Sequence, residues 1–133
     1  MLFVIRYRDG EPEPLETETV REVLAPYAVA GAGAGTGPGT GPLDGVLIRT
    51  PEGHEVDVDV NPWCLGISRF PPGRFFDVLA ELADRLRASV VPSDRPVVLR
   101  REEDRGHLPR EARRDAVVVA LTGLALARAL TGP

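Results

Sequence analysis

Residues 46–60 decide the fold, and they read VLIRT, PEG and HEVDVDV in succession. The outer segments are rich in β-branched residues, and the third alternates polar with apolar side chains, as strands do. Pro51-Glu52-Gly53 between them is typical of a turn, so we predict a β-hairpin with a three-residue connection. The predicted register pairs Thr50 with His54, Arg49 with Glu55, Ile48 with Val56, Leu47 with Asp57, and Val46 with Val58.

This register separates the hairpin into an apolar face and a charged face. The apolar face, which we expect to lie under the helices, consists of Val46, Ile48, Val56 and Val58. The charged face, which we expect to be open, carries Arg49, Glu55, Asp57 and Asp59. A slip of one residue would mix the two sets, so the pattern itself supports this register.

Residues 2–8 form a second alternating strand. Three of its side chains are expected to join the core, namely Phe3, Ile5 and Tyr7. Arg6 and Arg8 would then lie on the open face. If this strand lies beside the hairpin, they would meet Asp57 and Asp59, and opposite charges across neighbouring strands contribute about 0.2–1 kcal/mol each. The sequence therefore predicts a ladder of ion pairs on the open face.

The remaining elements complete the order β-α-β-β-α-β. A short helix over residues 20–27 follows the first strand, and an amphipathic helix over 74–88 follows the hairpin. A strand at 88–91, which residues 96–100 would extend, ends the series. This order predicts a ferredoxin-like α+β fold, with an antiparallel sheet and helices on one face. The chain, residues 1–133, has a length that suits a single domain.

Two segments stand outside this order. Residues 31–45, GAGAGTGPGTGPLDG, are expected to form a flexible loop, because that composition is entropically costly to order and matches no phosphate-binding motif. A C-terminal helical extension is expected at about 108–131. Its apolar part, residues 116–130, is expected to be a helix that is covered by the core of the domain or by a second copy in a homodimer.

Composition and charge narrow the classes of function. All 16 basic residues are arginine, and the net charge of −4 argues against general nucleic-acid binding. Residues 1–66 hold 4 Arg and 11 Asp or Glu, which gives −7, and residues 67–133 hold 12 Arg and 9 Asp or Glu, which gives +3. The lone cysteine, Cys64, and the lack of a recognisable targeting or spanning segment favour a cytoplasmic protein that does not bind membranes.

One local pattern raises the question of metal chemistry. Residues 57–61, DVDVN, match the opening of a calcium-binding loop, but its sixth position is proline and its twelfth is serine, which excludes that loop. Cys64 with His54 or His107 could form a nucleophile–base pair or contribute to a zinc site, yet no motif or ligand spacing supports either. We therefore assign no catalytic residue, no metal ligand and no cofactor.

Two classes of function remain. The favoured class is a small non-enzymatic module of immunity or regulatory type, which binds another protein, expected to be basic, through a polarised charged surface. Its candidate contacts are three acids of the charged face and a loop tryptophan, a residue type enriched at binding hot spots: Glu55, Asp57, Asp59 and Trp63. The alternative is a small enzyme or a ligand- or metal-binding protein that uses Asp57, Asp59, His54 and Cys64. The sequence does not decide whether the chain is an enzyme.

Overall fold

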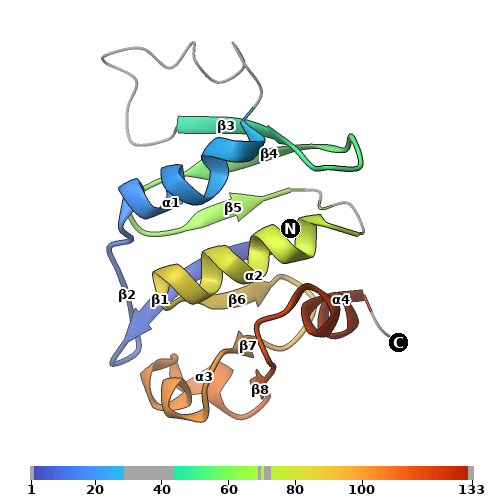
Figure 1. Ribbon diagram of the computed structural model, residues 1–133. Coiled ribbons are helices and arrows are strands. Elements are labelled where there is room, and N and C mark those ends of the chain that lie inside the picture. The colour runs from blue at the N-terminus through green and yellow to red at the C-terminus, as the bar shows by residue number, and fades with distance from the viewer. Residues whose placement is uncertain (1, 29–43, 69, 71–72, 132–133) are drawn as a thin grey trace.

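The computed structural model describes residues 2–28, 44–68, 70 and 73–131. These residues build an eight-stranded sheet, in the order β3-β4-β5-β1-β6-β7-β8, with β2 paired to β1 outside this path (Figure 1). Neighbouring strands are antiparallel except β7 and β8. The strands are β1 (Leu2–Arg8), β2 (Glu11–Glu13), β3 (Asp44–Arg49), β4 (Glu55–Val60), β5 (Leu65–Ile67), β6 (Ser89–Pro92), β7 (Val98–Leu99) and β8 (Val117–Val118).

The helices lie mainly on one face of the sheet. Figure 1 shows α1 (Thr17–Leu24) and α2 (Phe75–Leu86) side by side in front of the strands, with α4 (Gly123–Thr131) next to α2. The 3₁₀ turn η1 (Ala25–Tyr27) continues α1. A second 3₁₀ turn and a short helix, η2 (Glu102–His107) and α3 (Arg110–Arg113), lie at the β7 end of the sheet.

The hairpin prediction is confirmed. Strands β3 and β4 pair in the predicted register: Val46 with Val58, Leu47 with Asp57, Ile48 with Val56, and Arg49 with Glu55. Gly53 closes the turn with a φ of 94°, in the left-handed region that favours glycine. Strand β3 begins at Asp44, so the last two residues of the expected loop 31–45 belong to the sheet. Residues 31–43 lie outside the described part of the chain.

The main hydrophobic core lies between the sheet and helices α1, α2 and α4. Val56 and Val58 of β4 are buried in it, as the alternation predicted. The amphipathic prediction for the second helix is also confirmed, because α2 buries one face that includes Phe75, Phe76 and Leu79. Fully burying one such apolar side chain contributes about 1.5–3 kcal/mol. The burial of these side chains is therefore the main contribution that stabilises the packing of α2 on the sheet.

The buried face of β1 was predicted wrongly. Leu2 and Val4 are fully buried under the helices, whereas Phe3, Ile5 and Tyr7 lie on the opposite face and are half-buried. Apolar residues occupy both sides of this central strand, as they do in strands that are covered on both faces. Alternation alone therefore could not decide which side faces the helices.

A second, smaller hydrophobic cluster covers part of the opposite face. It consists of Val97, Leu99, Leu108 and Ala116, with Tyr7 and Val91 packed against it. Arg105 holds this cover together, because its guanidinium donates to the carbonyl of Arg113 at 2.6 Å, to the carbonyl of Ala116 at 2.8 Å and to the carboxylate of Glu102 at 2.7 Å. The sheet is thus covered on both faces near β7 and remains open at β4, where the outward side chains are exposed.

The fold is mixed α+β, but the ferredoxin-like order is not confirmed. The sheet has more strands than that fold, and β5 lies between β1 and β4. Because of Pro62 and Gly66, residues 61–66 were expected to be a loop that contains no strand. In the structure Leu65 and Ile67 are fully buried, and β5 pairs with both of its neighbours.

The C-terminal segment is not one helix, contrary to the prediction for residues 116–130. Val117–Val118 form β8 beside β7, since β-branched residues favour strands, and α4 begins only at Gly123. Helix α4 packs on α2 and buries Leu126 and Leu130, whereas Leu124 is 67% exposed. The core of the chain therefore covers one side of α4, and a homodimer through the other side stays a prediction.

Candidate functional site

The charged face of the hairpin carries three of the four predicted contact residues. Glu55, Asp57 and Asp59 alternate along β4 with the buried Val56 and Val58, so their carboxylates point away from the helices and are exposed. Residues two apart on a strand are about 6–7 Å apart, so the three carboxylates form a line along one straight element. We call this line the acidic strip.

Among the described residues, a cation lies beside only one end of the acidic strip. Nη2 of Arg49 on β3 lies 3.1 Å from Oε2 of Glu55, and both side chains are about half exposed. In the described part of the chain, Asp57 and Asp59 have neither an ion pair nor a side-chain hydrogen bond. The carboxylates of Asp57 and Asp59 are therefore exposed to solvent and repel each other slightly. A cation placed beside them would relieve this repulsion.

The predicted ion-pair ladder between β1 and the acidic strip does not form. Strand β5 separates β1 from β4, so the expected neighbours are one strand too far apart. Arg6 and Arg8 also lie on the side of β1 that carries the buried Leu2 and Val4, opposite to the strip. Arg6 instead lies beside Glu13 of β2, with its Nε 3.7 Å from Oε1.

An apolar surface lies beside the acidic strip. Across the sheet, Asp59 is opposite Gly66 of β5, and Gly66 is opposite Phe3 of β1. Gly66 has no side chain, and Phe3 and Ile5 are half-buried on the same face as Asp59. Acids beside apolar groups suit arginine or lysine, whose side chains combine an apolar stem with a cationic end.

Trp63 lies in the loop that follows β4, beyond the Asp59 end of the acidic strip, and it is 52% exposed. Asn61 orders this loop, because its Oδ1 accepts hydrogen bonds from the backbone N–H of Trp63 at 3.0 Å and of Cys64 at 2.9 Å. The carbonyl of Pro62 accepts a further bond from the N–H of Leu15 at 2.7 Å. The indole is thus presented by a loop that is tied down on both sides.

The structure does not bring together the residues that the alternative, enzymatic hypothesis would use. His54 precedes β4 and Cys64 follows it, and the six residues of β4 span about 20 Å. His107 lies on η2, where its Nδ1 is 3.7 Å from a carboxylate oxygen of Asp9. Within residues 2–28, 44–68, 70 and 73–131, no group of three or more His, Cys, Asp or Glu side chains is placed to hold a metal ion. The geometry therefore gives no nucleophile–base pair from these residues.

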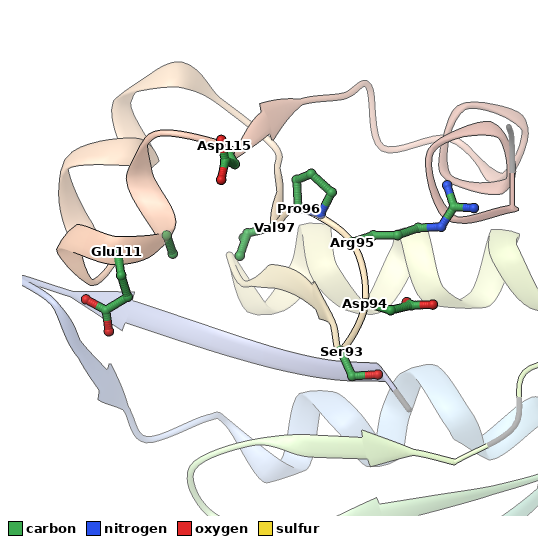
Figure 2. Close-up of a pocket in the computed structure, with 8 residues that line it drawn as sticks. Ser93, Asp94, Arg95, Pro96, Val97, Glu111 and Asp115 are labelled. Atoms are coloured by element: carbon green, nitrogen blue, oxygen red, sulfur yellow. The ribbon is translucent and has the colours of Figure 1, made fainter.

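An open cavity of about 470 Å³ lies between residues 93–97 and the α3 region. Figure 2 shows Glu111 and Asp115 on one side of it and Asp94 on the other, while the Arg95 side chain extends toward α4. None of the residues predicted from the sequence to bind a partner, a metal or a substrate lines this cavity. It is therefore separate from the predicted site.

A smaller cavity of about 220 Å³ was missed by the sequence analysis. Four arginines from three separate segments line it, and we call it the arginine pocket: Arg6, Arg8, Arg87 and Arg101. Their only sequence signal was the alternation that places Arg6 and Arg8 on one side of β1. Tyr7 also lines this pocket, and burial raises the pKa of its phenol above the ordinary value, with a smaller contribution from Cys64 and then Glu111.

Comparisons with family models, with curated proteins and with solved structures found no match to this chain. None of the helices in the described part of the chain has both the length and the apolar character that a bilayer-spanning helix requires.

Proposed function

We propose that this chain is a small non-enzymatic binding module, and that the acidic strip and Trp63 together dock a basic segment of another protein. The observation that carries this proposal is the exposure of Asp57 and Asp59 on one strand, with no cation from the described chain against them. Such a module would act by covering a basic surface of its partner, as an immunity-type or regulatory protein does.

The electrostatics of the acidic strip support a cationic partner. Asp57 and Asp59 stand on a strand inside the sheet, between β3 and β5, so their spacing is fixed before the partner arrives. Two cationic side chains about 6–7 Å apart would match them. Exposed ion pairs contribute only about 0–1 kcal/mol each in water, so the strip supplies orientation and association rate more than affinity.

Trp63 supplies the affinity that exposed ion pairs lack. Tryptophan is enriched among the few interface residues that carry most of the binding energy. The hydrogen bonds from the Trp63 and Cys64 backbone to Asn61 order its loop in the unbound chain, so less conformational entropy is lost on binding. In this proposal the acidic strip is the polar part of the binding surface, and the indole is its aromatic anchor.

Carbodiimide cross-linking in cells that make the protein tests this proposal, because the chain has no lysine. The reagent joins carboxylates directly to amines, so apart from its N-terminus the chain can be linked only to amines of a partner. We expect the links to map to Glu55, Asp57 and Asp59. Capture of the partner should fall in Asp57→Asn/Asp59→Asn and in Trp63→Ala.

The matched control is Glu11→Gln/Glu18→Gln, which changes the net charge by the same amount. Both control residues are exposed, and neither has an ion pair in the described part of the chain. We expect this variant to capture the partner as the unmodified chain does. Recovery of no partner, or equal capture by the strip variant and the unmodified chain, would contradict the proposal.

A further inference from the structure

The arginine pocket lies where the end of β1 meets β2, the C-terminal end of α2 and the start of η2. Arg6 and Arg8 line it from the side of β1 that also carries Leu2 and Val4, which is opposite to the side of the acidic strip. Arg6 is half-buried within the pocket, and Arg8, Arg87 and Arg101 are exposed around it. The pocket therefore presents guanidinium groups from separate segments to one small space.

The donors of these four arginines are largely unused. In the described part of the chain, none of the four side chains donates a hydrogen bond, and Arg8 and Arg87 have no ion pair. The ion pairs of Arg6 with Glu13, at 3.7 Å, and of Arg101 with Glu103, at 3.6 Å, are too long for hydrogen bonds. Each guanidinium carries five N–H donors, so the pocket offers many donors and few acceptors.

The charge of the pocket suits an anion. Its lining contains four arginines and only two carboxylates, Glu13 and Asp104, and Glu103, which is outside the lining, lies beside Arg101, so the arginines still outnumber the acids around it. At the nearby C-terminal end of α2, Arg100 donates to both the carbonyl and the carboxylate of Asp84, at 3.0 and 3.1 Å. A phosphate group carries a charge of about −1.5 to −2 at neutral pH.

The left-handed backbone conformation of Arg87 suggests that its side chain has a role in binding. This residue ends α2 in the left-handed region, with φ 54° and ψ 42°. Helices commonly end this way, but with glycine, because a Cβ is disfavoured there. Non-glycine residues in such conformations cluster at binding sites, where the side chain has a task. Here the strained residue contributes a guanidinium that glycine would not supply.

We propose that the arginine pocket binds a phosphate group, either as the free ion or at the end of a small phosphorylated molecule. Guanidinium forks match the oxygens of phosphate and donate charge-assisted hydrogen bonds to them. The volume of about 220 Å³ is below the roughly 300–1,000 Å³ that drug-sized ligands occupy, so it suits a phosphate group rather than a whole nucleotide.

Calorimetric titration of the full chain with inorganic phosphate, at constant ionic strength, tests this proposal. We compare Arg8→Ala/Arg87→Gly with Arg21→Ala/Arg128→Ala, whose exposed arginines lie on α1 and α4 and have no side-chain partner in the described part of the chain. Glycine suits the backbone at position 87, so the pocket variant keeps the fold, which circular dichroism checks. The expected result is phosphate binding that is weaker by roughly tenfold or more in the pocket variant and unchanged in the control.

Amide chemical shifts in the unmodified chain locate the ion. Phosphate should move the signals of residues 6–8, 87 and 101, and acetate at the same ionic strength should leave them in place. The proposal is overturned if phosphate binding does not saturate, if both variants lose affinity equally, or if acetate binds as tightly as phosphate. A small phosphorylated molecule that displaces inorganic phosphate and moves the same amide signals would show that the pocket also accepts a phosphate group at the end of such a molecule.

Discussion

The side-chain oxygen of Asn61 accepts a hydrogen bond from the backbone N–H of Trp63 at 3.0 Å, so one short polar residue orders the loop that carries the exposed indole. The same oxygen accepts the N–H of Cys64 at 2.9 Å, and the Asn61 amide donates to the Cys64 sulfur at 3.4 Å. Asparagine commonly bonds its own backbone two residues on, which is how it stabilises turns. The backbone at Trp63 is therefore held in place by the chain itself.

Replacing Asn61 with alanine should loosen this loop. We expect the free energy of unfolding to fall by about 1–2 kcal/mol, because two backbone N–H groups lose their acceptor. Trp63 is the only tryptophan, so its fluorescence anisotropy reports the loop directly. The anisotropy should decay faster in Asn61→Ala, whereas Asn61→Asp, which keeps the acceptor oxygen, should behave like the unmodified chain. Identical decay in all three proteins would count against this role.

The two faces of the sheet should respond differently to the same change. Val4→Ala removes a fully buried side chain beneath the helices and should cost about 2 kcal/mol of stability. Val91→Ala makes the same change on the opposite face, where Val91 is only partly buried, and should cost less than about 1 kcal/mol. Urea unfolding measures both. A larger loss for Val91→Ala would mean that the assignment of the faces is wrong.

The hairpin and α2 could be predicted because local patterns determine them. A three-residue turn leaves one register that keeps Ile48, Val56 and Val58 on one side, and the spacing of apolar residues in 75–86 fits only a helix. Strand β1 could not be assigned in this way, since it is apolar on both faces. Strand β5 was missed because its pairing partners lie far away in the sequence and Gly66 resembles a turn residue.

The two candidate sites also differ in how far local sequence patterns could predict them. Alternation along β4 was enough to predict the charged face that holds Asp57 and Asp59, but it could not show that these acids have no cation beside them. That result depends on strand β5, which separates β4 from β1 and was not predicted. The arginine pocket depends on residues 6–8, 87 and 101, which only the tertiary structure brings together, so no local pattern could indicate it.

Arg105 should control the order of the segment that covers the second cluster. Its guanidinium joins Glu102 to the carbonyls of Arg113 and Ala116, and a shorter or uncharged side chain cannot make all of these bonds. In Arg105→Ala we expect faster hydrogen exchange at the N–H of Val117, which donates to the carbonyl of Val97 just before β7. Arg105→Lys should be intermediate, because an ammonium lacks the planar fork. Exchange in β1 should not change, and unchanged exchange at Val117 would refute this role.

Tyr7 should make stability decline in alkaline solution. Burial raises the pKa of its phenol, so the folded chain keeps this proton at pH values where the unfolded chain, with a tyrosine pKa of about 10, has lost it. Between these two pKa values the folded state binds more protons, so the free energy of unfolding falls as pH rises; below about pH 10 this contribution is constant. Urea unfolding from about pH 9 upward should show this decline in the unmodified chain and less of it in Tyr7→Phe. Equal declines would contradict the burial of the phenol.

The acidic strip is tested most directly by the affinity of the cross-linked partner, measured with purified proteins at several salt concentrations. For Asp57→Asn/Asp59→Asn we expect an unchanged fold, binding that is weaker by a few-fold up to roughly tenfold, mainly through slower association, and a smaller loss of affinity as salt rises, because two attractive charges are gone. Glu11→Gln/Glu18→Gln, with the same net charge, should bind as the unmodified chain does. Equal affinity and equal salt dependence in all three proteins would contradict the claim that this module binds its partner through the acidic strip.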